Sequence, residues 1–138
     1  MEPYLHKVQY YETDKMGVVH HSNYLHWFEE ARLDFLDRIG ASYFSLEQRG
    51  YTSPVLSIQM DYISSVRFGE TVNVSAKLTE IRPVRYKFSY SVEDSVTGAV
   101  RAIGESVHCF LDKDGKILAF KRDDSALYDL FKAHMENR

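Results

Sequence analysis

The first third of the chain carries apolar side chains at helical spacing. Between Ser22 and Ile39, apolar residues recur at helical spacing, at Leu25, Phe28, Phe35, Leu36 and Ile39. Residues at this spacing share one face of an α-helix. The pattern therefore predicts a helix from Ser22 to Ile39.

Residues that favour helix termini mark both ends of this helix. Ser22, or the residue before it, can cap the start, and Gly40 follows the end, where a left-handed residue is favoured. Trp27 and Tyr24 widen the apolar surface beyond one stripe, which predicts a helix enclosed on more than one side. We expect Phe28 in the core.

After residue 55 the pattern changes to alternation of apolar and polar positions. The apolar sets are Leu56, Ile58, Met60 and Tyr62; Val72, Val74, Ala76 and Leu78; Tyr86, Phe88, Tyr90 and Val92; and Ile103, Val107, Cys109 and Leu111. Alternation predicts strands with one dry and one wet face, as in an antiparallel sheet. The segment "DKDG" at 112–115 is typical of a turn. Residues 4–11 predict a further strand, and residues 125–134 a short terminal helix.

The order of these elements defines the expected class of fold. One strand, one long helix and at least four consecutive strands predict an α+β domain with the helix on one face of the sheet. Because the helix is mostly apolar, we expect the sheet to curl around it. Tyr and Phe side chains are expected to remain on the opposite face, where a second copy of the chain would cover them.

Length and charge exclude several other classes of protein. The 138 residues, 44% of them hydrophobic, suit a single domain spanning residues 1–138. The net charge of -3 gives no basic footprint for nucleic acid. Cys109 is the only cysteine, so no intramolecular disulfide is expected. The sequence shows no secretory signal and no apolar run long enough to span a membrane, which predicts a cytoplasmic protein.

The segment "ETDKMGVVHHSN" offers the clearest candidate chemistry. Asp14 precedes a turn at Gly17, and the predicted helix begins a few residues later. Asp is common in such turns because its side chain bonds nearby backbone N–H groups. The start of a helix, however, offers unpaired N–H groups that can hold an anion or polarise a carbonyl. A carboxylate, the apolar Val18 and Val19, and a helix start within ten residues are compatible with a hydrolytic site.

Other polar residues give weaker signals. His20, His21 and His26 lack the spacing of a metal site, so no metal is predicted. No Gly-x-Ser-x-Gly motif is present to support a serine hydrolase. Glu29 is expected in solvent. Basic residues gather around a predicted hairpin, where they are either simply solvated or able to bind phosphates: Arg82, Arg85 and Lys87.

The stretch from Tyr11 to Tyr24, "YETDKMGVVHHSNY", closely resembles the signature of hotdog-fold acyl-CoA thioesterases of the 4-hydroxybenzoyl-CoA thioesterase family. His21 brings it nearest to the Tol–Pal-associated subgroup. The order of elements supports this resemblance over essentially the whole chain. It implies a hotdog fold, in which a curved antiparallel sheet wraps around a long central helix. It also implies homodimers or homotetramers with active sites at the dimer interface.

The sequence departs from the family pattern at three positions. The family often has Asp at the position of Glu12, Ala or Gly at that of Met16, and Pro near Ser65. None of these departures touches Asp14, Gly17 or His21. They therefore bear on the identity of the substrate more than on the type of reaction.

The resemblance implies hydrolysis of an acyl-CoA thioester without a cofactor. Asp14 matches the catalytic carboxylate, which either attacks the carbonyl or activates a water. The backbone N–H near His21 would stabilise the oxyanion, an interaction typically worth ~3 kcal/mol, while Gly17 shapes the turn. Residues implied at the substrate are Val19, Tyr24 and, for the CoA phosphates and from a neighbouring subunit, Arg82, Arg85 and Lys87.

Two other functions remain open on the same fold. A dehydratase acting on hydroxyacyl thioesters would require Glu30 to work with His20 or His21. A non-catalytic acyl-CoA-binding protein is the second alternative, because fold alone does not fix function. The acyl group and the choice between dimer and tetramer are not determined by the sequence.

Overall fold

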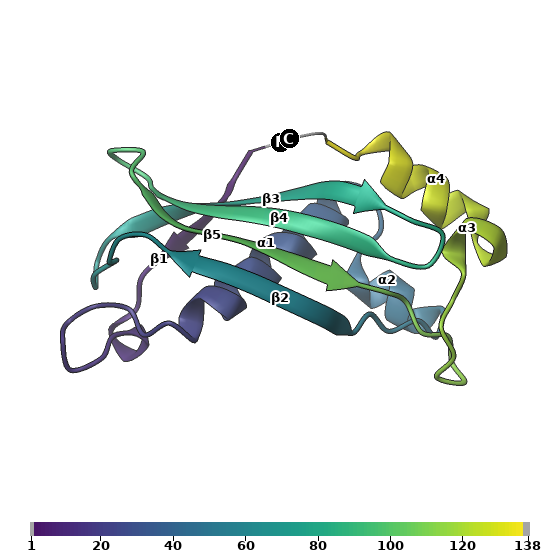
Figure 1. The fold of residues 1–138 in the computed structure, drawn as a ribbon, viewed down its shortest axis with the longest axis horizontal. Coiled ribbons are helices and arrows are strands. Elements are labelled where there is room, and N and C mark those ends of the chain that lie inside the picture. The colour runs from purple at the N-terminus through teal and green to yellow at the C-terminus, as the bar shows by residue number, and fades with distance from the viewer. Residues whose placement is uncertain (1, 137–138) are drawn as a thin grey trace.

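The computed structural model describes residues 2–136 and contains one antiparallel sheet with helices beside it. The strands are β1 (Tyr4–Lys7), β2 (Val55–Tyr62), β3 (Thr71–Ile81), β4 (Tyr86–Asp94) and β5 (Val100–His108). They lie in the order β1-β3-β4-β5-β2 (Figure 1). All neighbouring pairs are antiparallel, as the alternating pattern predicted. The result is an α+β fold.

Helix α1 (Asn23–Arg38) crosses one face of the sheet (Figure 1). Its buried residues are Tyr24, Trp27, Phe28, Ala31, Phe35 and Leu36. Phe28 lies in the core, as predicted, and its ring stacks on Tyr90 with 4.3 Å between centroids. Leu25 was assigned to the same face but is 42% exposed. At the end of the helix, Gly40 adopts a φ of +89°, as its position predicted.

The first predicted strand is shorter than expected. Strand β1 ends at Lys7, and the chain then forms a single turn of 3-10 helix, η1 (Tyr10–Glu12). Short helices follow elsewhere: α2 (Tyr43–Gln48), α3 (Phe120–Asp123) and α4 (Ser125–Ala133). Helix α4 agrees with the predicted terminal helix, and Asp112–Gly115 forms the predicted turn. No helix within the described residues is long and apolar enough to cross a membrane.

The outer face of β4 is polar, which corrects the expectation that its aromatic side chains remain there. In β4, the aromatic residues Tyr86, Phe88 and Tyr90 are all buried on the helix side. Their neighbours on the outer face are Lys87, Ser89, Ser91 and Glu93. The aromatic rings of β4 are therefore already covered by the helices of the same chain.

Strand β5 also has the opposite phase from the predicted one. Register with β4 places Ala102, Gly104, Ser106 and His108 on the helix side and Ile103 and Val107 on the outer face. Gly104 is small because a Cβ there would lie 2.6 Å from the Phe28 ring. The buried Ser106 hydroxyl lies 2.6 Å from both Tyr90 Oη and His108 Nε2. Small and hydrogen-bonded residues therefore replace the expected apolar ones inside this strand.

Candidate active site

A tight turn brings Asp14 next to the start of α1. Thr13 and Val19 pair as an antiparallel bridge across the turn. The Asp14 N–H donates to the Val18 carbonyl at 2.9 Å, and the Gly17 N–H donates to the Asp14 carbonyl at 3.0 Å. Gly17 has a φ of +78°, which L side chains rarely adopt. The glycine thus lets the chain reverse within four residues.

The Asp14 carboxylate has one oxygen in the turn and one without a partner. Oδ1 accepts the Met16 N–H at 2.8 Å, the contact expected of an ordinary turn aspartate. Among residues 2–136, Oδ2 makes no hydrogen bond and no ion pair. The side chain is half-buried and lines a cleft. The turn contact therefore fixes the carboxylate while leaving one oxygen available for chemistry.

The cleft beside Asp14 has a volume of about 300 Å³. The signature segment and the first turn of α1 form one side, with Asp14, Met16, Val18, Val19, His21 and Tyr24. The end of β2 and the residues after it form the other side, with Tyr62, Ile63, Ser64 and Ser65. Two segments about 40 residues apart in sequence thus face each other across it.

At the start of α1, the His21 backbone N–H has no acceptor among the described residues. Ser22, predicted as a possible cap, makes no capping bond to the helix; its Oγ lies 2.8 Å from His20 Nδ1. The Ser22 N–H donates to His20 Nδ1 at 3.3 Å, and the N–H groups of Asn23 and Tyr24 donate to the carbonyls of His20 and His21. The unsatisfied donor in this turn is therefore on a residue that lines the cleft.

Two tyrosines, one from each side of the cleft, contact each other. Tyr24 is buried, and burial raises the pKa of its phenol to about 12. The Tyr62 hydroxyl donates to the His21 carbonyl at 3.3 Å, and burial raises its pKa as well. The two rings meet edge to face at 5.2 Å. Both phenols therefore remain neutral at physiological pH and supply a rigid, uncharged surface.

Glu12 anchors the segment that leads into Asp14. Its buried carboxylate accepts the Gln9 N–H at 2.7 Å and the Trp27 indole N–H at 2.7 Å, and lies 2.9 Å from His6 Nε2. Burial would raise the pKa of Glu12, but these hydrogen bonds outweigh it and hold the pKa below its usual value. Its backbone carbonyl also accepts the Asn23 side-chain N–H at 2.9 Å. Glu12 thus ties β1, η1 and α1 together.

The structure brings four predicted site residues together and leaves others apart. Asp14, Val19, His21 and Tyr24 all line the cleft, and Gly17 forms the adjacent turn without lining it. The predicted phosphate-binding residues Arg82, Arg85 and Lys87 lie at the other end of β3 and β4. At ~3.3 Å per residue, the length of β3 separates the two groups by roughly 30 Å within one chain.

Sequence reasoning missed the wall formed by Tyr62, Ile63, Ser64 and Ser65. A signal was present, because consecutive serines end the alternation of β2 in "YISSVRF". Polar residues at a strand end often line sites. Only the tertiary fold shows that these particular serines face Asp14.

The arrangement needed by a dehydratase is absent from the described residues. Glu30 lies 3.5 Å from His6 Nδ1, while His20 bonds to Ser22. No ion pair joins Glu30 to His20 or His21. Glu29 is exposed, as expected. The acid–histidine pair proposed for dehydration is therefore not assembled on this chain.

A larger hollow, of about 430 Å³, lies on the outer face of the sheet. Its side chains are mainly Ser, Gln, Asp, Lys and Glu, and it contains none of the residues of the signature segment. Volume alone therefore does not identify the reactive site. The smaller cleft is lined by both Asp14, whose carboxylate has one oxygen without a partner, and His21, whose backbone N–H has none among the described residues.

Comparisons with known proteins identify the family of the chain. The chain matches the thioesterase-like superfamily over residues 8–130. It is 33% identical over 120 residues to an Aquifex aeolicus protein named as a candidate esterase, covering 87% of this chain and 91% of that protein. It is 31% identical over 117 residues to Bacillus subtilis YneP, named as a candidate acyl-CoA thioesterase, covering 84% of each.

A solved structure adds a match in three dimensions. The DHNA-CoA thioesterase of Staphylococcus aureus superposes with a TM-score of 0.90 and 28% sequence identity, covering 96% of this chain and 89% of that one. Sheet, helices and matches together define an α+β protein of the hotdog class. The chain belongs to the thioesterase-like superfamily, and it is a thioester hydrolase.

Proposed function

We propose that this protein hydrolyses acyl-CoA thioesters in the cleft beside Asp14. One observation carries the proposal: a carboxylate with an unpartnered oxygen and the unpartnered N–H of His21 belong to residues that line the same cleft. The first can attack or act as a base, and the second can stabilise an oxyanion. The printed names of YneP and of the Staphylococcus aureus enzyme support a CoA thioester as substrate.

Asp14 supports either of two balanced reactions. As a nucleophile, it adds to the thioester carbonyl and expels the CoA thiolate, giving a mixed anhydride that water then hydrolyses. As a general base, it takes a proton from a water that attacks the carbonyl, and the thiolate leaves with a proton. In both, the His21 N–H donates to the carbonyl oxygen as negative charge develops. The His21 imidazole would orient the substrate or the water.

Thiol release from a panel of acyl-CoAs tests the proposal. The panel includes short aliphatic, aromatic and naphthoyl esters, because the cleft walls combine Val19 and two tyrosines with two serines. We expect Asp14→Asn to lower kcat by a factor of about 10³ or more, as general-base or nucleophile removal does. The matched control is Asp37→Asn, an exposed carboxylate on α1 far from the cleft. Full activity in Asp14→Asn would exclude this role.

A single turnover in ¹⁸O-labelled water separates the two routes. If Asp14 is the nucleophile and water attacks its own carbonyl in the anhydride, one label enters the Asp14 side chain. If Asp14 is a general base, or if water attacks the acyl carbonyl of the anhydride, all of the label enters the released acid, so label in the Asp14 side chain is the result that identifies the nucleophilic route. Mass spectrometry of the peptide containing Asp14 reads out the difference.

Two sets of cations are candidates for the CoA phosphates. Arg82, Arg85 and Lys87 require a second copy of the chain to approach the cleft, and Arg82 already pairs with Glu80 at 2.9 Å. Arg67 lies on the same chain, with its guanidinium 3.6 Å from the Cβ position of Gly17. Its side chain has no carboxylate partner among the described residues. We infer that Arg67 contributes to phosphate binding.

Truncated substrates separate the two sets of cations. Arg67→Ala is expected to raise KM for acyl-CoA about tenfold, a loss typical of one charge-assisted phosphate contact, while leaving KM for the matching acyl-N-acetylcysteamine thioester unchanged. Arg82→Ala serves as the comparison. A rise in KM for Arg82→Ala alone would favour the hairpin contributed by a neighbouring subunit.

A second copy of the chain is proposed to pair along β2. This strand is one of the two edges of the sheet and exposes Val55, Leu56, Ile58 and Tyr62. An exposed apolar edge strand is a template for pairing with another strand. Because Tyr62 also lines the cleft, pairing there would place the site at the interface. Sedimentation should show a dimer or tetramer, and Ile58→Asp should shift it towards monomer; a monomeric wild type would contradict the proposal.

A further inference from the structure

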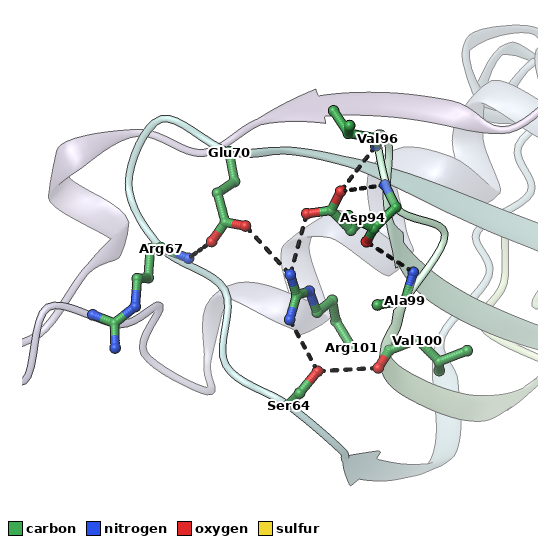
Figure 2. Close-up of polar contacts among 9 residues, drawn as sticks. Ser64, Arg67, Glu70, Asp94, Val96, Ala99, Val100 and Arg101 are labelled. Carbon is green, nitrogen blue, oxygen red and sulfur yellow. Dashed lines mark hydrogen bonds and ion pairs between the residues drawn. The ribbon is translucent and has the colours of Figure 1, made fainter.

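Arg101, near the start of β5, bonds to two segments beside the candidate cleft (Figure 2). Its Nη1 donates to Ser64 Oγ at 3.2 Å. Its Nη2 lies 3.2 Å from Asp94 Oδ2 and 3.4 Å from Glu70 Oε2. Its backbone carbonyl accepts the N–H groups of Ile63 and Ser64 at 2.9 and 3.1 Å. This mostly buried residue thus holds the segment 63–70 near both ends.

Asp94 gives Arg101 a fixed and charged partner. Its Oδ1 accepts the N–H groups of Val96 and Thr97 at 2.8 and 2.9 Å, in the turn after β4. These hydrogen bonds, and then the Arg101 guanidinium, hold the pKa of Asp94 well below its usual value. Asp94 therefore stays ionised at physiological pH and fixes the orientation of Arg101.

The segment 63–70 connects Arg101 to the turn of Asp14. Ser64 and Ser65 line the cleft opposite Asp14. Further along, the Val66 carbonyl accepts the Val19 N–H at 2.8 Å, and Arg67 pairs with Val18 in an antiparallel bridge. Glu70 closes the loop by accepting the Arg67 N–H at 2.6 Å (Figure 2). The Arg101 side chain therefore contacts one wall of the cleft directly, through Ser64, and is linked to the other wall through the segment 63–70.

We propose that Arg101 is a positioning residue of the candidate active site, which fixes the segment 63–70 and through it the separation between Ser64 and the Asp14 turn. Arg101 does not itself line the cleft. The kinetic consequence rests on the proposed function, whereas the structural consequence does not. Specificity and rate in such a site depend on wall placement, because a shift of about 1 Å can cost as much as 10²-fold in rate.

Two conservative variants separate positioning from a general effect on stability. Arg101→Lys keeps a positive charge near Asp94 and Glu70, but one ammonium cannot reproduce the planar fork that also reaches Ser64. Ser64→Ala removes the hydrogen bond from Arg101 and the hydrogen bond from the Ser64 hydroxyl to the Val100 carbonyl, and leaves the ion pairs of Arg101 in place. The matched control is Arg38→Lys, which changes an arginine paired with Asp34 at the far end of α1.

The readouts are Tm, kcat and KM for the best acyl-CoA, and hydrogen exchange of single amides. We expect both variants to keep Tm within a few degrees of wild type but to lower kcat/KM by about tenfold for Arg101→Lys and about threefold for Ser64→Ala. The Asp14 and Val19 amides should exchange about tenfold faster in Arg101→Lys, because local opening becomes easier. The Tyr90 amide, in the middle of the sheet, and all properties of Arg38→Lys should be unchanged.

The outcomes distinguish this inference from the proposed function. Unchanged exchange at Asp14 and Val19 in Arg101→Lys, or an activity loss that only parallels Tm, would overturn the positioning role. A wild-type protein that releases no thiol from any acyl-CoA would contradict the proposed function instead. In that case faster exchange at Asp14 and Val19 would still support the role of Arg101 in holding the turn.

Discussion

The two ends of the sheet are held together by different kinds of interaction. At the end near α3 and α4, buried aromatic rings pack against one another, with the Tyr86 ring centroid 5.1 Å from Phe110 and 5.2 Å from Phe131. At the end near Asp14, ionised and hydrogen-bonded groups such as Glu12 and Arg101 fix the backbone. The ends lie at opposite sides of the molecule in Figure 1.

The difference agrees with the sizes of the open spaces at the two ends, about 300 Å³ beside Asp14 and about 170 Å³ beside Tyr86. Apolar packing is stabilising only where side chains fill the space, so an aromatic cluster leaves little open space. Directional hydrogen bonds can instead hold two loops at a set distance with space between them. The aromatic end therefore contributes mainly to the stability of the fold, and the polar end fixes the distance between the two loops that form the cleft.

The largest expected effect on stability belongs to the aromatic end. Phe131 is fully buried, and Phe131→Ala should lower the free energy of unfolding by about 3–5 kcal/mol through lost burial and a cavity. At a temperature where the variant is folded, kcat/KM should stay close to wild type. Urea unfolding and steady-state kinetics check both parts. A large loss of kcat/KM in the folded variant would show that the two ends are not separable.

The second-largest effect is expected at the polar end, where one substitution should lower both the free energy of unfolding and the activity. In Glu12→Gln, an amide replaces the carboxylate and can accept fewer of the hydrogen bonds donated to it. This should lower the free energy of unfolding by about 1–3 kcal/mol. Because Glu12 anchors the segment before Asp14, kcat/KM should fall as well. The exposed Glu47→Gln on α2 is the control and should alter neither quantity. If Glu12→Gln lowered the free energy of unfolding but left kcat/KM unchanged, Glu12 would not affect the geometry of the Asp14 turn.

The dependence of stability on pH should differ between the ends. His108 stacks on Tyr86, and burial first, then the Arg32 charge, lowers its pKa to about 3 from an ordinary value of 6.5. The unfolded chain therefore binds this proton first, so stability falls as pH drops from about 6.5 towards 3. Urea unfolding of His108→Gln should show a flatter profile over this range.

Asp94 provides the comparison at the polar end. Its pKa is lowered in the folded state. The stabilisation that Asp94 gives the folded state is therefore present above the ordinary carboxyl pKa of about 4, and it is lost only as the pH falls below that value. Asp94→Asn should therefore change the profile below about pH 4 and leave its shape near pH 6 unaltered. A change of shape near pH 6 in this variant would contradict the assignment of that range to His108.

The smallest effect is expected for an ion pair on the surface of α1. Arg38 and Asp34 lie one helical turn apart with 3.0 Å between Nε and Oδ2. Both are partly exposed, so Arg38→Ala should change the free energy of unfolding by only about 0.3–0.5 kcal/mol. Differential scanning calorimetry at low and high salt measures it. A loss comparable to that of Glu12→Gln would mean that the end of α1 contributes more than its exposure suggests.

Much of the fold could be predicted because it depends on local periodicity. The spacing around Phe28 predicted α1 to within one residue at each end, and Gly40 marked its end correctly. Strand β5 was misread because its inner face carries Gly104, Ser106 and His108. Close packing against Phe28 and hydrogen bonding to Tyr90 decided these residues, and neither effect is visible within one strand.

The residues of the candidate site fall into the same two groups, those placed by local sequence and those placed by contacts between distant segments. Asp14, Gly17 and the start of α1 lie within ten residues, so their proximity follows from the chain itself. Ser64 lines the cleft and is bonded by Arg101 only because β2 and β5 pair in one register, which places Asp61 opposite Ile103. Such pairing depends on contacts between distant segments.

By itself the sequence determined the class of fold, the helix and a turn with a carboxylate beside it, because these follow from spacings of a few residues. The tertiary structure alone decided that one oxygen of Asp14 lacks a partner, that the wall of the cleft comes from β2, and that Arg101 braces it. Burial and hydrogen bonding between distant segments set these features, so they exist only once the sheet has formed.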